Sequence, residues 1–218
     1  MGNDGGSLPK RSDLLLYNDK DTHEASATEL VKGKAYSGWL YCGLTRQKLK
    51  AKKSPVVADW EGRLYNKMGV LEYLLSQKSG KTNSTTSTNI TSINDVVQLK
   101  INLDTDAETL LDPLTSTIHK LDSCPTMCYL VPCGCVMDKA ALLQLIKQEK
   151  QVKCLVCSTE FEKRDIVTIN PSTIVLQELQ SRYDKLKAES LWPNLKPRKV
   201  KKKRGASADT TVSKKVKK

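Results

Sequence analysis

The sequence predicts an α+β protein with two small lobes, each made of short β-hairpins and one helix, then a C-terminal helix and a disordered basic tail. Three features predict this fold class. Short apolar runs near Pro55 and Leu64 are typical of short strands. Apolar residues recur at helical spacing after Asn66, Asp138 and Pro171. Basic residues accumulate after residue 195, where apolar residues become too rare to form a core.

Length and composition set the size class. The chain has 218 residues, of which 39% are hydrophobic and 28% are charged, and this suits one medium domain or two small ones. No apolar run approaches the ~18 residues that a membrane-spanning helix needs. The first ten residues also lack the apolar core of a signal peptide. We therefore expect a soluble intracellular protein with no membrane partner.

The positive charge is concentrated at one end of the sequence. Of the formal net charge of +12, residues 196–218 contribute eleven Lys and Arg against the single acid Asp209. The rest of the chain is close to neutral. This distribution assigns the basicity to the tail rather than to a folded face.

The first lobe is expected over residues 36–78. Residues 1–35 before it are Gly-rich and then polar, without a periodic pattern that predicts a helix or strand. Residues 56–58 and 64–65 are predicted strands on either side of a turn signal at residues 61–63. Asn66 is predicted to cap a helix whose apolar face carries Val70, Leu71, Leu74 and Leu75.

The second lobe is expected over residues 96–171. Residues 79–95 before it are rich in Ser, Thr and Asn and are interpreted as a flexible linker. A strand is predicted at residues 96–103. Asp138 is predicted to cap a helix that runs to about Lys150, with Leu142, Leu145 and Ile146 facing inward.

A C-terminal helix is predicted over residues 172–190, with Ser172 or Thr173 as its cap. Its apolar stripe either packs on the second lobe or receives a partner helix; it consists of Val175, Leu176, Leu179, Tyr183 and Leu186. Trp192 and Pro193 are expected to end the helix. Residues 191–218 are then predicted to be a disordered basic tail.

Two close pairs of cysteines carry the strongest chemical signal. Cys133 and Cys135 precede the predicted helix of the second lobe, and Cys154 and Cys157 follow it. Thiolates bind Zn²⁺ well in tetrahedral sets of four, so the four residues predict one structural Zn²⁺. Packing as small buried side chains and a redox pair at Cys154 and Cys157 are the alternatives. A zinc hydrolase or deaminase would need an open metal position and a nearby Glu, which this pattern does not offer.

A second metal site is a weaker possibility in the same region. His119, Cys124 and Cys128 could begin it, and Asp112 is the nearest carboxylate, but no fourth ligand is evident. We therefore expect a single ion, with these residues as ordinary side chains. Cys42 stands alone in the first lobe and is expected to be a packed thiol.

The cysteine pattern resembles that of the RING/U-box superfamily. Cys133-x-Cys135 and Cys154-x-x-Cys157 look like the two ligand pairs of one RING zinc site, with Cys135 in the place of a His. Asp138 stands where a RING has a cysteine of its other zinc site, so the resemblance implies that this other site is lost, as in SP-RING proteins. The first lobe resembles a U-box, in which hydrogen bonds and packing replace both metals.

The chain more narrowly resembles the replication termination factor 2 family. Similarity lies in the opening residues 1–11, in residues 62–67, in the strand at 99–103 and in the signature Cys133-Gly-Cys-Val136, all in the family's order. The chain departs from the family where Asp112-Pro113 replaces the usual Cys-Pro. The resemblance implies a nuclear protein that acts at stalled replication forks, with links to the sliding clamp, or in pre-mRNA splicing with spliceosome components.

The resemblance also raises the question of enzyme activity. RING and U-box ligases dock a charged E2 in an apolar groove and use no catalytic residue of their own, and Leu44 and Pro55 could supply such a groove in the first lobe. Leu155 replaces the proline usual in the second lobe. An adaptor acting through protein–protein contacts is favoured, with a ubiquitin or SUMO ligase as the alternative. Ordinary packing is the other explanation of Leu44 and Pro55.

The tail fits a nuclear import signal, because a Lys/Arg run can lie in an acidic receptor groove. It can also contact phosphates non-specifically, or be a solvated charge run. The basic residues concerned are Lys196, Arg198, Lys199, Lys201, Lys202, Lys203 and Arg204. No aromatic residue interrupts the run to stack on bases, so sequence-specific reading of nucleic acid is not expected.

Overall fold

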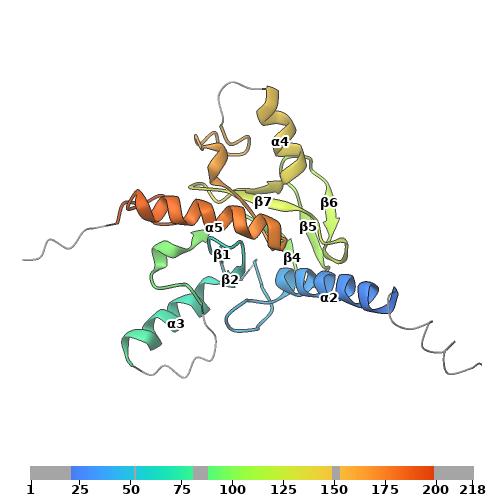
Figure 1. Ribbon diagram of the computed structural model, residues 1–218, viewed down its shortest axis with the longest axis horizontal. Helices are drawn as coiled ribbons and strands as arrows, with labels where there is room; N and C mark the ends of the chain where they lie inside the picture. Colours follow the sequence, from blue (N-terminus) through green and yellow to red (C-terminus); the bar gives the residue numbers. More distant parts are fainter. Residues whose placement is uncertain (1–20, 52, 81–87, 149–152, 199–218) are drawn as a thin grey trace, which may run out of the picture.

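Three small antiparallel sheets and four helices form the part of the protein that the structure describes (Figure 1). The structure is a computed structural model and describes residues 21–51, 53–80, 88–148 and 153–198. The α+β class predicted from the sequence is confirmed. The predicted strands and helices of the two lobes are present, and a third sheet, for which the sequence pattern gave no expectation, lies between them in chain order.

The first lobe contains β1 (Val56–Ala58), β2 (Leu64–Asn66), α3 (Lys67–Lys78) and β3 (Val97–Gln98). Its sheet has the order β2-β1-β3. Asn66 precedes α3, but its side chain makes no cap hydrogen bond; it donates to the carbonyl oxygen of Lys48 at 3.5 Å instead. The predicted cap position is therefore correct and the predicted capping bond is wrong.

The second lobe repeats the same arrangement. It contains β7 (Met127–Leu130), β8 (Val136–Asp138), α4 (Lys139–Gln148) and β9 (Ile166–Thr168), with sheet order β8-β7-β9. Asp138 caps α4 as predicted, because its Oδ1 accepts a hydrogen bond from the Ala141 amide at 2.9 Å. Leu142 and Ile146 are buried beneath the helix.

The third sheet joins the two lobes. It is formed by β4 (Asn102–Asp104), β5 (Thr109–Leu111) and β6 (Ile118–Lys120). The strand predicted at residues 96–103 is thus divided between β3 and β4, which belong to different sheets. The division occurs at Lys100, whose amide donates to the Gly134 carbonyl of the second lobe at 2.7 Å.

One core underlies both lobes. Val57 of β1, Tyr129 of β7 and Val167 of β9 belong to the same cluster of buried apolar side chains. A smaller cluster lies under α4 and includes Met137 and Leu142. The segment expected to be a linker, residues 79–95, contributes to this core through the buried Ile90. Residues 93–95 form a 3₁₀ turn, and residues 81–87 lie outside the described part of the chain.

The lobes meet through two equivalent glycines. Gly62 in the β1–β2 turn lies against the carbonyl of Thr168, and Gly134 in the β7–β8 turn lies against the carbonyl of Gln98. A Cβ at either glycine would be 2.0 Å from that carbonyl oxygen. The adjacent hydrogen bonds also match, since Asn170 N donates to Gly62 O at 3.0 Å as the Lys100 amide does to Gly134. The hairpin turn of each lobe therefore packs against the third strand of the other lobe: the β1–β2 turn against β9, and the β7–β8 turn against β3.

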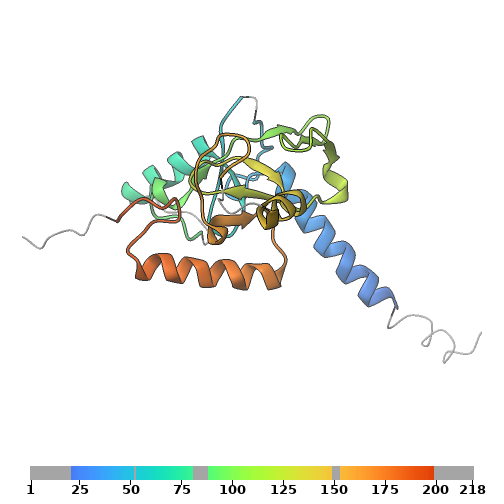
Figure 2. The same cartoon turned by 90° about the horizontal axis from the view of Figure 1, so that it is seen from above.

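A long helix precedes the first lobe. Helix α2 (Asp21–Leu40) crosses the boundary expected at residue 35, which corrects the expectation of an irregular polar segment up to that residue. Its last turn is anchored by Trp39 and Leu40, which are buried in the core, while Leu30 and Val31 are exposed. Figure 2 shows that the helix projects away from the body. Burial of Trp39 and Leu40 in its last turn attaches this helix to the body, and the helix has no amphipathic pattern along its length.

Helix α5 (Thr173–Ala188) lies across both lobes (Figure 1). The ring of Tyr183 stacks on Trp60 of the first lobe, with centroids 4.5 Å apart and planes 2° from parallel. Arg182 forms a buried ion pair with Asp165 of the second lobe at 2.9 Å. The apolar stripe of the helix is therefore part of the core, and Leu179 and Leu186 are buried.

The chain after α5 folds back before the basic tail begins. The Arg198 amide donates to the Ser190 carbonyl at 2.9 Å, and the Arg198 guanidinium lies over the Trp192 ring at 4.5 Å. Pro193 is buried. Residues 191–198 are thus ordered, which corrects the predicted start of the tail at residue 191. Residues 199–218 lie outside the described residues.

Candidate metal centre

Four cysteine sulfurs meet at one point of the second lobe. The Sγ atoms of Cys133, Cys135, Cys154 and Cys157 all lie within 4.8 Å of one another. Sulfurs around one tetrahedral ion at about 2.3 Å are roughly 3.8 Å apart. The Cys135 and Cys157 sulfurs, which are 3.6 Å apart, already have this spacing. The four residues that the sequence predicted as ligands are therefore brought together in a set that can hold one metal ion.

Each pair of cysteines is presented by a tight turn. Gly134 has φ +72° between Cys133 and Cys135, a conformation that side chains disfavour, and its amide donates to the Leu130 carbonyl at 2.7 Å. In the other turn, Ser158 N donates to Cys154 O at 2.7 Å. One turn precedes α4 in the sequence and the other follows it, yet their sulfurs lie together in space. An ion at this point would connect the two turns.

The protein environment separates the proton affinities of these thiols. Burial raises the pKa of Cys133 to about 11. Burial, followed by the contact with Cys157, raises the pKa of Cys135. A hydrogen bond with the Thr159 hydroxyl at 3.2 Å lowers the pKa of Cys157 to about 6. A bound cation would stabilise all four thiolates, so metal binding and proton release are coupled here.

The donor set is complete without any further ligand. Four thiolates fill a tetrahedral coordination sphere and leave no position for water or substrate, which is the arrangement of structural sites rather than catalytic ones. The chemistry available is therefore the fixing of two turns in one geometry.

The candidates for a second metal site are dispersed. His119 in β6 pairs with the Thr117 hydroxyl at 3.0 Å, and the Cys124 thiol faces the Lys32 carbonyl of α2 at 3.6 Å. The Cys128 thiol donates to the Met137 carbonyl at 3.6 Å. Among the residues that the structure describes, the four-cysteine cluster is the only group placed to share an ion.

Asp112 closes a turn of the second lobe through hydrogen bonds of its backbone and side chain. Its amide donates to the carbonyl five residues later, as that of Cys42 does in the first lobe. The buried Asp112 carboxylate accepts hydrogen bonds from the Leu114 amide at 3.0 Å and the Thr115 hydroxyl at 2.7 Å. Side-chain hydrogen bonds thus close this turn where a RING would use metal ligands.

Cys42 closes the equivalent turn of the first lobe. Its fully buried sulfur accepts hydrogen bonds from the Thr45 amide at 3.5 Å and the Asn66 amide at 3.3 Å. This sulfur therefore has a structural role within the described residues, in agreement with the expected packed thiol.

An ion pair stands in the first lobe where the second lobe has its first two metal-site cysteines. Glu61 and Arg63 flank Gly62 as Cys133 and Cys135 flank Gly134, and their side chains are paired. Asn89 also donates to the Glu61 carboxylate at 3.0 Å. The first lobe therefore has polar contacts at the position where the second lobe has two of its clustered cysteines.

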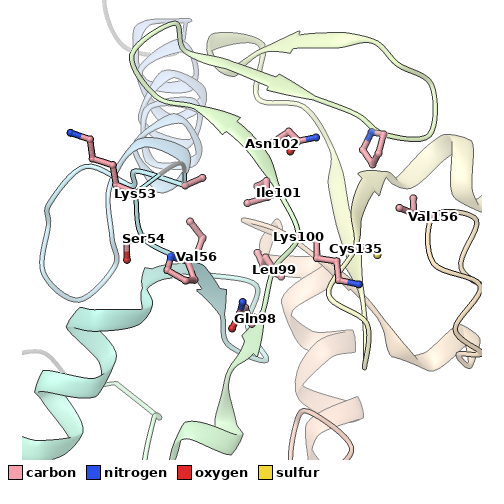
Figure 3. A pocket seen from close by; sticks show the side chains of 13 residues that line it. Lys53, Ser54, Val56, Gln98, Leu99, Lys100, Ile101, Asn102, Cys135 and Val156 are labelled. Carbon is pink, nitrogen blue, oxygen red and sulfur yellow. The ribbon is translucent and has the colours of Figure 1, made fainter.

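The remaining predicted site residues have different surroundings. Leu44 is half-buried and packs against the core, whereas Pro55 is exposed and lines a hollow of about 470 Å³ beside the cysteine cluster (Figure 3). Lys196 is exposed. Arg198 is held by its contact with Trp192, and the other basic residues named above lie outside the described residues.

Sequence reasoning missed two surface features. Leu155 and Val156, between the last two cysteines, are 43% and 47% exposed. The lysines at positions 48, 50 and 53 are also exposed together near the same hollow. The signal for the second feature was present, because residues 30–58 contain seven Lys and Arg and no acid.

These observations define a class of protein: an α+β body with two RING/U-box-like lobes, one of which keeps a single four-cysteine site. The comparison with known families agrees, since the family described as "Rtf2 RING-finger" matches residues 1–218. The chain belongs to this family. The resemblance found in the sequence is confirmed.

Several relatives with names are similar to this chain. "Splicing factor rtf2" of Schizosaccharomyces pombe is 34% identical over 184 residues, which cover 84% of this chain and 70% of the relative. "Replication termination factor 2" of Sus scrofa is 31% identical over 201 residues, covering 84% and 61%. The protein of the same name from Gallus gallus is 30% identical over 205 residues, covering 87% and 63%. The chain thus spans a little over three fifths of these two vertebrate relatives.

No helix among the described residues has the length and apolar character that crossing a membrane requires.

Proposed function

We propose that this chain is a nuclear adaptor that acts at stalled replication forks, in site-specific termination and fork stabilisation, through protein–protein contacts. One structural Zn²⁺ would be held by Cys133, Cys135, Cys154 and Cys157. The family membership and the relatives named replication termination factor 2 support the setting. The all-thiolate donor set supports zinc as the ion.

The observation that carries the adaptor role is the exposed apolar pair at the metal-site turn. Leu155 and Val156 face solvent although their neighbours Cys154 and Cys157 are fixed in the cluster. An apolar pair held in one geometry loses little conformational freedom when a partner covers it. The ion supplies rigidity, and the side chains between its ligands supply the contact.

The partner surface can be tested by affinity purification from nuclear extract. We expect replisome components, including the sliding clamp, to be recovered with the wild-type chain and lost with Leu155→Ser/Val156→Ser. The matched control is Leu75→Ser/Ile118→Ser, which removes two exposed apolar side chains on other elements. Equal recovery with both double variants would contradict the proposed surface.

A role in splicing is the second candidate, because the relative from S. pombe is named a splicing factor and is 34% identical to this chain. The same purification distinguishes the two settings. Spliceosome components in place of replisome components would favour splicing and would overturn the proposed setting at forks.

Ligase activity is a further alternative, which the exposure of Pro55 favours. Leu44 packs against the core and is less available to an E2. Incubation with E1, a panel of E2s and ubiquitin or SUMO tests this directly. We expect no chain formation; zinc-dependent chains that disappear with Leu44→Ala would establish a ligase.

Nuclear import through an import receptor is proposed for the basic stretch that begins at Lys196. Deletion of residues 199–218 leaves the ordered turn and its Arg198–Trp192 contact in place. We expect the shortened protein to shift to the cytoplasm. Continued nuclear accumulation would count against this role of the tail.

A further inference from the structure

Three hollows along the first lobe and its junction with the second share lining residues and therefore adjoin one another. The hollow beside the start of α3, of about 610 Å³, shares Lys53 and Ser54 with the hollow of about 470 Å³ seen in Figure 3. That hollow shares Gln98 and Lys100 with a third, of about 410 Å³. We call these three adjoining hollows the cationic track.

The lining of the track is strongly one-sided in charge. It includes one carboxylate, Glu72, and six lysines: Lys48, Lys50, Lys53, Lys67, Lys100 and Lys196. Residues 1–195 are close to neutral in total, but lysines outnumber carboxylates along these hollows. This corrects the conclusion that the basicity belongs to the tail and not to a folded face.

The ammonium groups of the track are available to a ligand. Lys48, Lys50, Lys53 and Lys100 are exposed, and no ion pair joins these lysines to a carboxylate in the described part of the chain. Within the described residues, Lys67 donates to the Gln98 amide oxygen at 2.9 Å and to no carboxylate. Figure 3 shows Lys53 on the loop at one side of the middle hollow and Lys100 on the segment between β3 and β4 at the other side.

Lys196 belongs both to the track and to the basic stretch of the sequence, of which residues 199–218 lie outside the described part of the chain. Lys196 lines the third hollow and is also the first residue of the stretch 196–218, with its eleven Lys and Arg. The six lysines of the track lie in three hollows that adjoin one another. A ligand that contacts all three hollows must carry negative charge at several points along its length.

We propose that the cationic track binds the phosphodiester backbone of nucleic acid without reading its sequence. Lysines act as point charges toward phosphates, and each contact releases condensed counterions. The lining contains no aromatic ring on which a base could stack, so the contact is made to the backbone. A short acidic peptide would fill one hollow but not all three.

The test is fluorescence anisotropy with the full-length protein and labelled single-stranded DNA, single-stranded RNA and duplex DNA of mixed sequence. Lys50→Glu/Lys53→Glu reverses two charges of the track. Lys120→Glu/Lys163→Glu reverses two exposed lysines elsewhere and changes the net charge equally. Both double variants keep the tail, and thermal melting verifies that each is folded. A labelled poly-glutamate peptide is the fourth ligand.

We expect the track variant to weaken nucleic-acid binding about tenfold or more at 0.1 M salt and to reduce the slope of log K against log salt by about two. The control should change affinity less than threefold. The nucleic acid that binds most tightly shows whether the track prefers single-stranded DNA, single-stranded RNA or duplex DNA. Equal effects of the two double variants, or tighter binding of poly-glutamate than of every nucleic acid, would overturn the proposal.

Discussion

Gly62 and Gly134 hold the same place in the two lobes, and each lies against the third strand of the other lobe. The Thr168 carbonyl faces Gly62 as the Gln98 carbonyl faces Gly134. Both glycines also have positive φ, +80° and +72°. Because the contact occurs twice, the two lobes form one body with one core. The orientation of the metal-site turns relative to the first lobe depends on it.

Substitution of either glycine is expected to destabilise the whole body. A Cβ at Gly134 would lie 2.0 Å from the Gln98 carbonyl oxygen, so the lobes must separate locally. We expect Gly134→Ala to reduce the free energy of unfolding by about 3 kcal/mol or more. Denaturant unfolding of the zinc-loaded protein measures it.

Gly80→Ala is the matched control for this prediction. Gly80 has a similar φ of +71°, but a Cβ there would meet no atom within 4 Å. It should lose only the ~1–2 kcal/mol that the left-handed conformation costs a residue with a Cβ. Equal losses for the two variants would show that the contact between the lobes contributes nothing.

The buried ion pair of Arg182 and Asp165 is expected to attach α5 to the second lobe. Arg182→Ala leaves the Asp165 carboxylate buried without its partner, which typically costs about 3–5 kcal/mol. Arg164→Ala breaks two more exposed pairs, with Glu162 and with Glu189, and should cost about 1 kcal/mol or less. Urea unfolding compares the two. Similar losses would mean that burial of the first pair is unimportant.

Asp59 is expected to make stability depend on pH. Burial raises the pKa of this carboxyl to about 6, although it accepts hydrogen bonds from Tyr65 and the Arg63 amide. A raised folded-state pKa stabilises the fold below the unfolded value near 4, and this contribution is lost as pH rises through about 6. It amounts to up to about 3 kcal/mol.

Asp59→Asn removes this titration. The free energy of unfolding of the variant minus that of the wild type should therefore rise between pH 4 and 7. Taking the difference cancels acid effects on the cysteine cluster, which both proteins share. Parallel pH profiles would contradict the assigned pKa.

Local sequence was sufficient for the hairpins and helices of the two lobes and for the cysteine cluster, but not for the third sheet or for α2. Asp138 caps α4 through a neighbour three residues away, and each cysteine pair is set by one tight turn. These features depend on contacts within a few residues, so spacing and residue type reveal them. The family resemblance rested on the same short segments.

The relation between the lobes was not predictable in the same way. The contact of Gly62 with Thr168 joins positions far apart in the sequence, and the β-strands involved have only two to four residues each. Helix α2 was missed because its polar sequence has no amphipathic pattern, and burial of Trp39 holds its end. The Arg198–Trp192 contact was missed because Arg198 was counted with the tail's charge run.

The cluster of Cys133, Cys135, Cys154 and Cys157 is the central element of this account. Native mass spectrometry of the wild type, Cys135→Ser and Cys124→Ser tests it most directly, since Cys124 lies outside the cluster. We predict one Zn²⁺ per chain in the wild type and in Cys124→Ser, and none in Cys135→Ser. No zinc in the wild type, or equal zinc in all three proteins, would contradict the account.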